Sequence, residues 1–331
     1  MRSDSVALRL VMMATGGFAL PTFRALLDSQ HSVVGLFTQP DRTGRGHHHH
    51  VNPLKELALE RKLPVFQPES AKTPEAIAEL AALSPDLCVV AAYGQILSAA
   101  LLAVPRLGAI NVHASILPKY RGAAPIQTAV LQGETETGVT IFQIEPKLDA
   151  GPILGIGRTP IGERETSGEL EARLAVLGAR LAVQVVDQLA QGTTQPIVQD
   201  AAQATRAPRL KKEDGRIDWN RWPRQIDCQV RALQPWPLAY SMLTLRPDQA
   251  GGPARSLRLI VLEVVAAEAP PIAPVAAPPG TVLAVDNKRL VVQAGGGALE
   301  LRRLQPEGKR AMTAGEFLAG NPVQPGDRFE G

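Results

Sequence analysis

Cysteine is scarce in this sequence, with 2 residues among 331. Cys88 and Cys228 lie far apart, and Cys88 sits in an apolar run where it is expected to behave as a small buried hydrophobe. No disulfide framework is therefore expected, which favours a reducing compartment and a cytoplasmic protein. No apolar run approaches about eighteen residues, so no membrane span is predicted. Residues 1–4 lead into a predicted strand and not into the apolar region of a signal peptide.

Two common ligand motifs are missing as well. Thr15-Gly16-Gly17 follows the first predicted strand, but it is not G-x-G-x-x-G and no acidic residue ends the second strand, so nicotinamide binding is not favoured. Four consecutive histidines, residues 47–50, have no accompanying Cys or acidic cluster, and adjacent side chains point in different directions. No metal site is predicted from them.

The composition is that of an ordinary globular protein, with 45% apolar and 20% charged residues. The length allows two domains, each with its own core. Residues 1–205 carry 17 Lys and Arg against 19 Asp and Glu, whereas residues 206–331 carry 18 against 13. A basic C-terminal half indicates a polyanionic partner or, equally, an ordinary solvated surface.

The first half alternates strand-like and helix-like segments. Strands are predicted at residues 8–13, 33–37, 87–92, 109–113 and 140–145, and helices at residues 18–27, 51–61, 74–83 and 167–189. Asn52 is expected to cap the second helix and Ser167 the last. This alternation predicts an α/β fold with a doubly wound, mostly parallel sheet over residues 1–190, whose ligands bind beyond the carboxyl ends of the strands.

The pattern changes in the second half. Residues 191–210 contain Gly192, Pro196 and Pro208 and are predicted to form a linker. Beyond it a helix is predicted at residues 223–232, and short strands at residues 240–245, 257–265, 280–285, 289–294 and 298–304. Five short strands with Gly and Pro turns predict that residues 211–331 form a small β-barrel of the OB type.

Polar side chains gather at the expected carboxyl edge of the sheet. Alternation places Asn111 and His113 on one face of a strand end, and Asp149 follows the next strand. An amide can stabilise a developing oxyanion, an imidazole can relay or stabilise charge, and a carboxylate can orient the imidazole or accept a proton. This combination suits acyl transfer. The alternative is a core histidine beside a turn-forming asparagine.

Two loops border these residues. The loop that starts at Ser115 includes Pro118 and Arg121, and with Tyr93-Gly94 at the neighbouring strand end it could cradle a flat heteroaromatic ligand. A second loop carries Arg42 and Arg45, which could meet phosphates or could simply be solvated.

At this point the chain resembles the methionyl-tRNA formyltransferase family. The resemblance rests on residues 111–118, 120–127, 138–143 and 148–151 in the first half, and on residues 38–46, 210–219, 231–237 and 308–312 for the acceptor. The first set is shared with formyltransferases that act on other amines, so it is specific for use of 10-formyltetrahydrofolate and not for the acceptor. The chain departs from the family pattern at residues 14–16 and at His47–His50.

The resemblance implies transfer of a formyl group from 10-formyltetrahydrofolate to the α-amino group of initiator methionyl-tRNA, without a metal, by a monomer. It implies catalytic roles for Asn111, His113 and Asp149. The residues expected to bind the folate are Ser115, Ile116, Leu117, Pro118, Tyr93 and Gly94, and those expected to bind tRNA are Arg42, Arg45, Lys211, Lys212, Lys309 and Arg310. The alternatives are a formyltransferase for a small amine or sugar nucleotide, and a non-catalytic RNA-binding protein.

Overall fold

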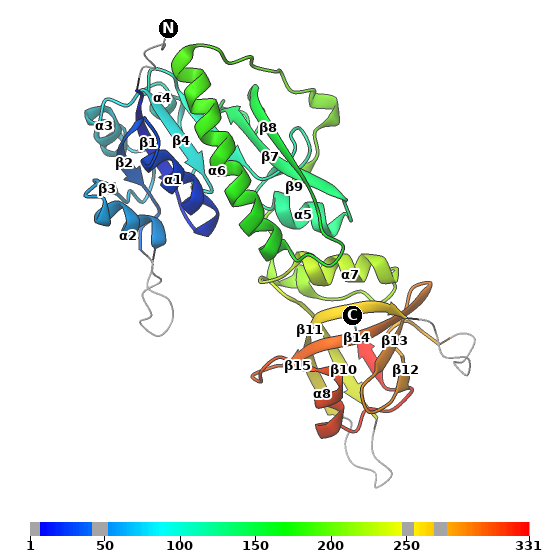
Figure 1. Cartoon of the computed structure of the whole chain (residues 1–331). Helices are drawn as coiled ribbons and strands as arrows, with labels where there is room; N and C mark the ends of the chain where they lie inside the picture. Colours follow the sequence, from blue (N-terminus) through cyan, green and yellow to red (C-terminus); the bar gives the residue numbers. More distant parts are fainter. Residues whose placement is uncertain (1–6, 42–51, 247–254, 268–276, 331) are drawn as a thin grey trace. The chain divides into compact units, whose positions relative to one another are not determined.

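The computed structural model of the chain describes residues 7–41, 52–246, 255–267 and 277–330. The chain divides into two compact units, which are described separately (Figure 1). The first unit comprises Met1–Pro125, Glu136–Pro160 and Leu170–Pro208, and the second comprises Ile126–Thr135, Ile161–Glu169 and Arg209–Gly331. No helix among the described residues combines the length and apolar character needed to cross a membrane.

A seven-stranded sheet forms the centre of the first unit, in the order β3-β2-β1-β4-β5-β7-β8. Its strands are β1 (Arg9–Ala14), β2 (Ser32–Phe37), β3 (Val65–Phe66), β4 (Leu87–Ala91), β5 (Ala109–His113), β7 (Glu136–Gln143) and β8 (Ile153–Pro160). The first five strands are parallel, whereas β7 is antiparallel to β5 and β8 is antiparallel to β7. The predicted doubly wound, mostly parallel sheet is confirmed, and β3 and β8 are additions to it.

The chain leaves β1 towards β3 and then returns to β4 on the other side of β1. The helices that make these crossovers are α1 (Leu20–Leu27), α2 (Pro53–Glu60), α3 (Pro74–Ala82) and α4 (Ala99–Leu102). Asn52 caps α2 as predicted, because its side chain accepts hydrogen bonds from the amides of Leu54 and Lys55. The strand order reverses between β1 and β4, and open α/β sheets bind ligands at the carboxyl ends of their strands near such a reversal.

The long helix α6 (Ser167–Gln191) packs against one face of this sheet. A Cβ atom on Gly178 of α6 would lie 2.9 Å from the side chain of Val112. Val112 stands between Asn111 and His113 in β5. Since alternate residues of a strand point to opposite faces, Asn111 and His113 point away from α6.

The prediction that Ser167 caps α6 is wrong. The Ser167 hydroxyl donates instead to the carbonyls of Ala232 and Gln234. Thr166 forms a capping box with Glu169: the amide of Glu169 donates to the Thr166 hydroxyl at 3.3 Å, and the amide of Thr166 donates to the Glu169 carboxylate at 2.8 Å. Thr166 and Ser167 can both cap a helix. Ser167 bonds the distant carbonyls of Ala232 and Gln234 instead, so Thr166 caps α6.

A second seven-stranded sheet, antiparallel throughout, forms the core of the second unit. Its strands are β10 (Ala239–Leu245), β11 (Arg255–Ala267), β12 (Val282–Val285), β13 (Leu290–Ala294), β14 (Gly297–Pro306), β15 (Met312–Thr313) and β16 (Arg328–Glu330), and its helices are α7 (Pro223–Ala232) and α8 (Ala314–Gly320). The five predicted strands are present, and β15 and β16 were not foreseen.

This sheet is curled. Along the order β12-β13-β14-β11-β10-β16, the outermost strands return to each other, because the amide of Val282 donates to the carbonyl of Asp327 at 2.9 Å and the amide of Phe329 donates to that of Gly280 at 2.8 Å. The curled sheet encloses a core in which the Trp219 and Phe329 rings lie 5.3 Å apart. The three-residue strand β16 is therefore bonded on both sides, to β10 and to the segment that begins β12.

The capping box at the start of α6 leads to a stability prediction. Thr166→Ala removes the acceptor for the Glu169 amide and should lower the free energy of unfolding by about 1 kcal/mol. Urea unfolding followed by circular dichroism measures the change. Thr166→Ser keeps the hydroxyl and should remain close to the parent protein; equal losses in the two variants would contradict the capping role.

Candidate active site

The candidate site forms at the carboxyl end of β5. The neighbouring strand β7 runs antiparallel, so that Phe142 lies opposite Asn111 and Thr140 lies opposite His113. Residues directly opposite each other in two paired strands share a face, which places Phe142 on the face of Asn111 and His113. The Phe142 and His113 rings meet edge to face, with 6.2 Å between their centroids.

The His113 ring is buried and held on both sides. Its Nε2 lies 3.0 Å from the backbone carbonyl of Tyr120, and its Nδ1 lies 4.0 Å from Oδ2 of Asp149. Because a carbonyl can only accept, Nε2 must carry a proton, and Nδ1 of the neutral ring therefore carries the lone pair. That lone pair is on the side of the Asp149 carboxylate, where it can accept a proton.

Burial lowers the pKa of His113 below its ordinary value of 6.5. The Asp149 carboxylate and the hydrogen bond to Tyr120 act in the opposite direction, and burial is the larger effect. His113 is therefore neutral at neutral pH. The carboxylate nearby would stabilise the imidazolium that forms if Nδ1 takes up a proton.

Asp149 reaches the site from the loop between β7 and β8. Its Oδ2 accepts a hydrogen bond from the amide of Gly122 at 2.8 Å, and its backbone is in the left-handed region at φ 47°. Non-glycine residues in that region are strained by about 1–3 kcal/mol and persist only where surrounding contacts hold them. The structure thus brings Asp149 to His113 across 35 residues of sequence.

The loop expected to bind folate, residues 115–118, begins directly after β5. Ser115 is buried, and its hydroxyl donates to the carbonyl of Lys119 at 2.6 Å. Thr140 ties the loop to β7, since its hydroxyl donates to the Ser115 carbonyl and accepts from the amide of Leu117. Ile116 and Pro118 are half-buried in the same loop. Its conformation is therefore fixed from within.

Tyr93 and Gly94 lie at the end of β4, the strand beside β5. The Tyr93 carbonyl accepts hydrogen bonds from Thr15 and from the side chain of Gln39, so it is tied to the ends of β1 and β2. Burial raises the pKa of the Tyr93 hydroxyl to about 12. Gly94 is exposed and has φ +77°, a conformation that favours glycine and leaves its backbone open to a ligand.

Two residues at the site, Gln199 and Thr205, carried no signal in the sequence, and Thr140 lies in a segment of the family resemblance but was not among the expected site residues. Thr140 supports the loop after β5. The Thr205 hydroxyl accepts a hydrogen bond from the amide of Tyr120 at 2.9 Å, and the Gln199 side chain contacts the Asp149 loop. The pairing of β6 (Arg121–Gly122) with β9 (Arg206–Ala207) brings the segment of Gln199 and Thr205 here. Threonine and glutamine are common on surfaces, and only the pairing of these distant segments marks them.

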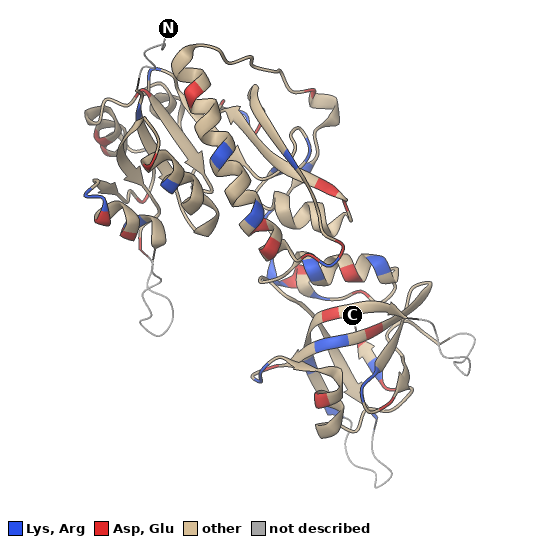
Figure 2. Cartoon of the chain, viewed as in Figure 1, with Lys and Arg blue, Asp and Glu red and all other residues tan. Residues whose placement is uncertain are grey.

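The structure describes four of the six cationic residues expected to bind tRNA. Arg42 and Arg45, and His47–His50, lie outside the described residues. Lys211, Lys212, Lys309 and Arg310 belong to the second unit, and Arg310 is paired with Glu316 at 2.8 Å. Lys and Arg are interspersed with Asp and Glu over the unit (Figure 2).

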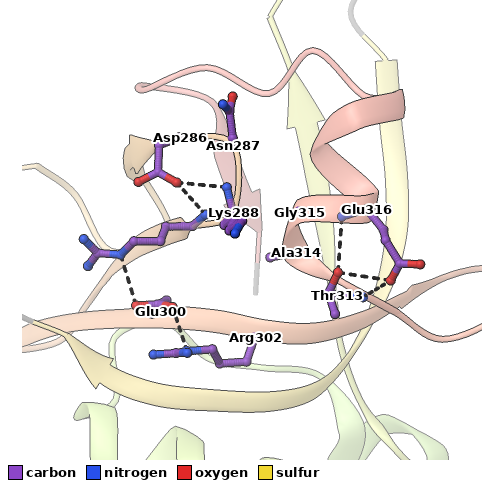
Figure 3. Close-up of a pocket in the computed structure, with 10 residues that line it drawn as sticks. Asp286, Asn287, Lys288, Glu300, Arg302, Thr313, Ala314, Gly315 and Glu316 are labelled. Carbon is purple, nitrogen blue, oxygen red and sulfur yellow. Dashed lines mark hydrogen bonds and ion pairs between the residues drawn. The ribbon is translucent and has the colours of Figure 1, made fainter.

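A pocket of about 1310 Å³ lies in the second unit, between the β12–β13 turn, β14 and the start of α8 (Figure 3). Its charged side chains are largely occupied with one another: Glu300 pairs with both Arg289 and Arg302, and Glu316 closes the capping box of Thr313. It contains none of the residues expected to act in catalysis. The candidate active site therefore remains the end of β5.

Comparison with known proteins defines the class. Residues 8–186 match the family model described as formyl transferase, and residues 209–322 match that of the formyl transferase C-terminal domain. The chain belongs to the formyl transferase family. Among curated relatives, the methionyl-tRNA formyltransferase of Methylococcus capsulatus is 45% identical over 94% of this chain and 96% of its own length. That of Ectopseudomonas mendocina is 47% identical over 92% of both chains, and the resemblance noted in the sequence is thereby confirmed.

Solved structures share the fold at lower identity. An N-formyltransferase from Helicobacter canadensis, in complex with folinic acid and dTDP-3-aminofucose, is 16% identical with a TM-score of 0.61, over 89% of this chain and 98% of that one. HypX from Aquifex aeolicus, in complex with tetrahydrofolic acid, is 16% identical with a TM-score of 0.58, over 98% of this chain and 51% of that one.

The surroundings of His113 lead to a prediction about its titration. Nuclear magnetic resonance of histidine-labelled protein should give a midpoint for His113 below 6.5, because burial disfavours the imidazolium. In Asp149→Asn the midpoint should fall further, since the carboxylate that raises this pKa is gone. His113→Gln identifies the signal by its loss. A midpoint above 6.5, or one that Asp149→Asn leaves unchanged, would contradict the geometry.

Proposed function

We propose that this protein transfers the formyl group of 10-formyltetrahydrofolate to the α-amino group of initiator methionyl-tRNA. The observation that carries the proposal is the identity of 45% over nearly the full length, both domains included, with a relative named methionyl-tRNA formyltransferase. By contrast, the N-formyltransferase solved with an amino-sugar nucleotide shares only 16% identity. A small amine or sugar nucleotide is therefore the less favoured acceptor.

The formyl donor fits the edge of the sheet between the ends of β4 and β5. Ile96 lies two residues after the exposed Gly94, and Leu148 directly precedes Asp149; these two apolar residues are 73% and 69% exposed. Apolar side chains beside exposed backbone suit a flat heteroaromatic ring. Tetrahydrofolic acid is the ligand named for the HypX structure of the same fold, which supports a folate donor here.

The reaction joins the acceptor nitrogen to the formyl carbon and breaks the bond between that carbon and N10 of the folate. The amine loses one proton as it attacks, and the carbonyl oxygen becomes an oxyanion in the tetrahedral intermediate. In the proposed mechanism the Asn111 amide donates to this oxygen. His113 Nδ1 and Asp149 carry the amine proton to N10 of the leaving tetrahydrofolate and stabilise the charge that develops.

We propose that residues 211–331, which lie in the second unit, act as an OB-like tRNA-binding domain. In this proposal residues 1–190 form the catalytic domain, and residues 191–210 connect the two. Its curled antiparallel sheet and the basic balance of the C-terminal half support this role. The proposal includes a monomer that acts in the cytoplasm, where charged tRNA and folate occur together.

The role of Asn111 leads to a prediction about turnover. Asn111→Ala removes one oxyanion donor and should lower kcat for formylation of methionyl-tRNA by about 10²–10³-fold, with an unchanged thermal unfolding midpoint. Near-parental turnover would remove Asn111 from the mechanism. The assay is repeated on the parent protein with free methionine and an amino-sugar nucleotide, and faster formylation of either would replace the proposed acceptor.

The cationic residues lead to a prediction about salt dependence. Each Lys or Arg that contacts phosphate releases counterions, so Arg42→Ala with Arg45→Ala, or Lys211→Ala with Lys212→Ala, should weaken tRNA binding and reduce the slope of log affinity against log salt by about one for each contact. Filter binding from low to moderate salt measures the slope. Arg180→Ala, an exposed arginine on α6, is the control. An unchanged slope would place the varied residues away from phosphate.

A further inference from the structure

Gln199 lies in the segment between α6 and β9, and its side chain is buried beside the Asp149 loop. The amide nitrogen donates to the backbone carbonyls of Asp149 at 3.0 Å and of Gly151 at 2.8 Å. Its oxygen accepts from Nε of Arg121 at 3.2 Å and from Nη2 at 2.6 Å. A carboxamide has two N–H donors and two acceptor lone pairs, and all four are used here.

These bonds hold the backbone of Asp149, whose carboxylate lies beside His113. The two carbonyls that Gln199 binds belong to Asp149 itself and to the second residue after it. Asp149 is in the strained left-handed region, and such a conformation persists only where neighbours hold it. Without the Gln199 amide, two carbonyls of this loop would lose a donor.

The other half of the network joins the Asp149 loop to β6. Arg121, which donates to Gln199, directly precedes Gly122. The amide of Gly122 donates to the Asp149 carboxylate. The carbonyl of Tyr120, the residue before Arg121, accepts from His113. Backbone and carboxylate of Asp149 are therefore both tied to the short stretch of chain that also orients His113.

Resting on the proposed function, we infer that Gln199, together with Arg121, is a positioning residue that holds the Asp149 carboxylate at His113 for formyl transfer. Neither side chain needs to touch a substrate. Misplacement of a catalytic group by about 1 Å can cost about 10²-fold in rate, so loss of this support acts on turnover.

Kinetics of two Gln199 variants provide the first test. Gln199→Ala removes all four hydrogen bonds and should lower kcat by about 10–10²-fold while KM for both substrates changes less than about twofold. Gln199→Glu keeps the acceptor for Arg121 but cannot donate to the two carbonyls, so it should lose activity as well. Gln199→Glu also provides the kinetic test if Gln199→Ala does not fold. Gln203→Ala is the control, because Gln203 is exposed in the same segment and bonds only Asp200.

The titration of His113 provides a second test that needs no turnover. If Gln199 holds the carboxylate near the ring, Gln199→Ala should shift the His113 midpoint downwards, towards that of Asp149→Asn, whereas Gln203→Ala should not. A folded Gln199→Ala with parental kcat and parental titration would overturn the inference. An inactive parent protein would overturn the proposed function instead, and the titration would still decide the role of Gln199.

Discussion

The hydrogen bond between His113 Nε2 and the carbonyl of Tyr120 is the interaction on which the rest of the site depends. It fixes the plane of the ring and leaves Nδ1 on the side of Asp149. To provide that carbonyl, the chain must turn back after β5, and Tyr120 takes a left-handed backbone conformation at φ 64°. The tight loop of residues 115–118 and its bonds to Thr140 make this return possible.

Close approach of backbones is the second constraint. A Cβ atom on Gly122 would lie 2.4 Å from the carbonyl oxygen of Ala207, so only glycine lets β6 pair with β9 at this point. That pairing carries Gln199 and Thr205 to the site from the segment after α6. A segment that the sequence predicts as a linker thus contributes directly to the surroundings of the candidate catalytic residues.

Local sequence signals were sufficient to predict most helices and buried strands. They failed where tertiary packing determined the structure. Period and capping located α2, with Asn52 at its start. Strand β8 was not predicted, because Gly155 and Gly157 weaken its strand propensity. Both glycines face α6: a Cβ atom on Gly155 would lie 3.2 Å from the side chain of Leu181, and one on Gly157 would lie 3.1 Å from that of Leu177. The packing of this helix is therefore the reason for glycines that are locally unfavourable in a strand.

The sequence by itself determined the alternation of strands and helices, and the polar residues Asn111 and His113 on one face of a strand end, because side-chain period is a local property. It also carried the family resemblance that the comparisons confirmed. Only the tertiary structure decided that Asp149 lies 4.0 Å from His113, which tautomer the ring adopts, and that Gln199 donates to the backbone of Asp149. These features depend on contacts between segments far apart in the chain, and no local pattern specifies which of many polar residues will meet.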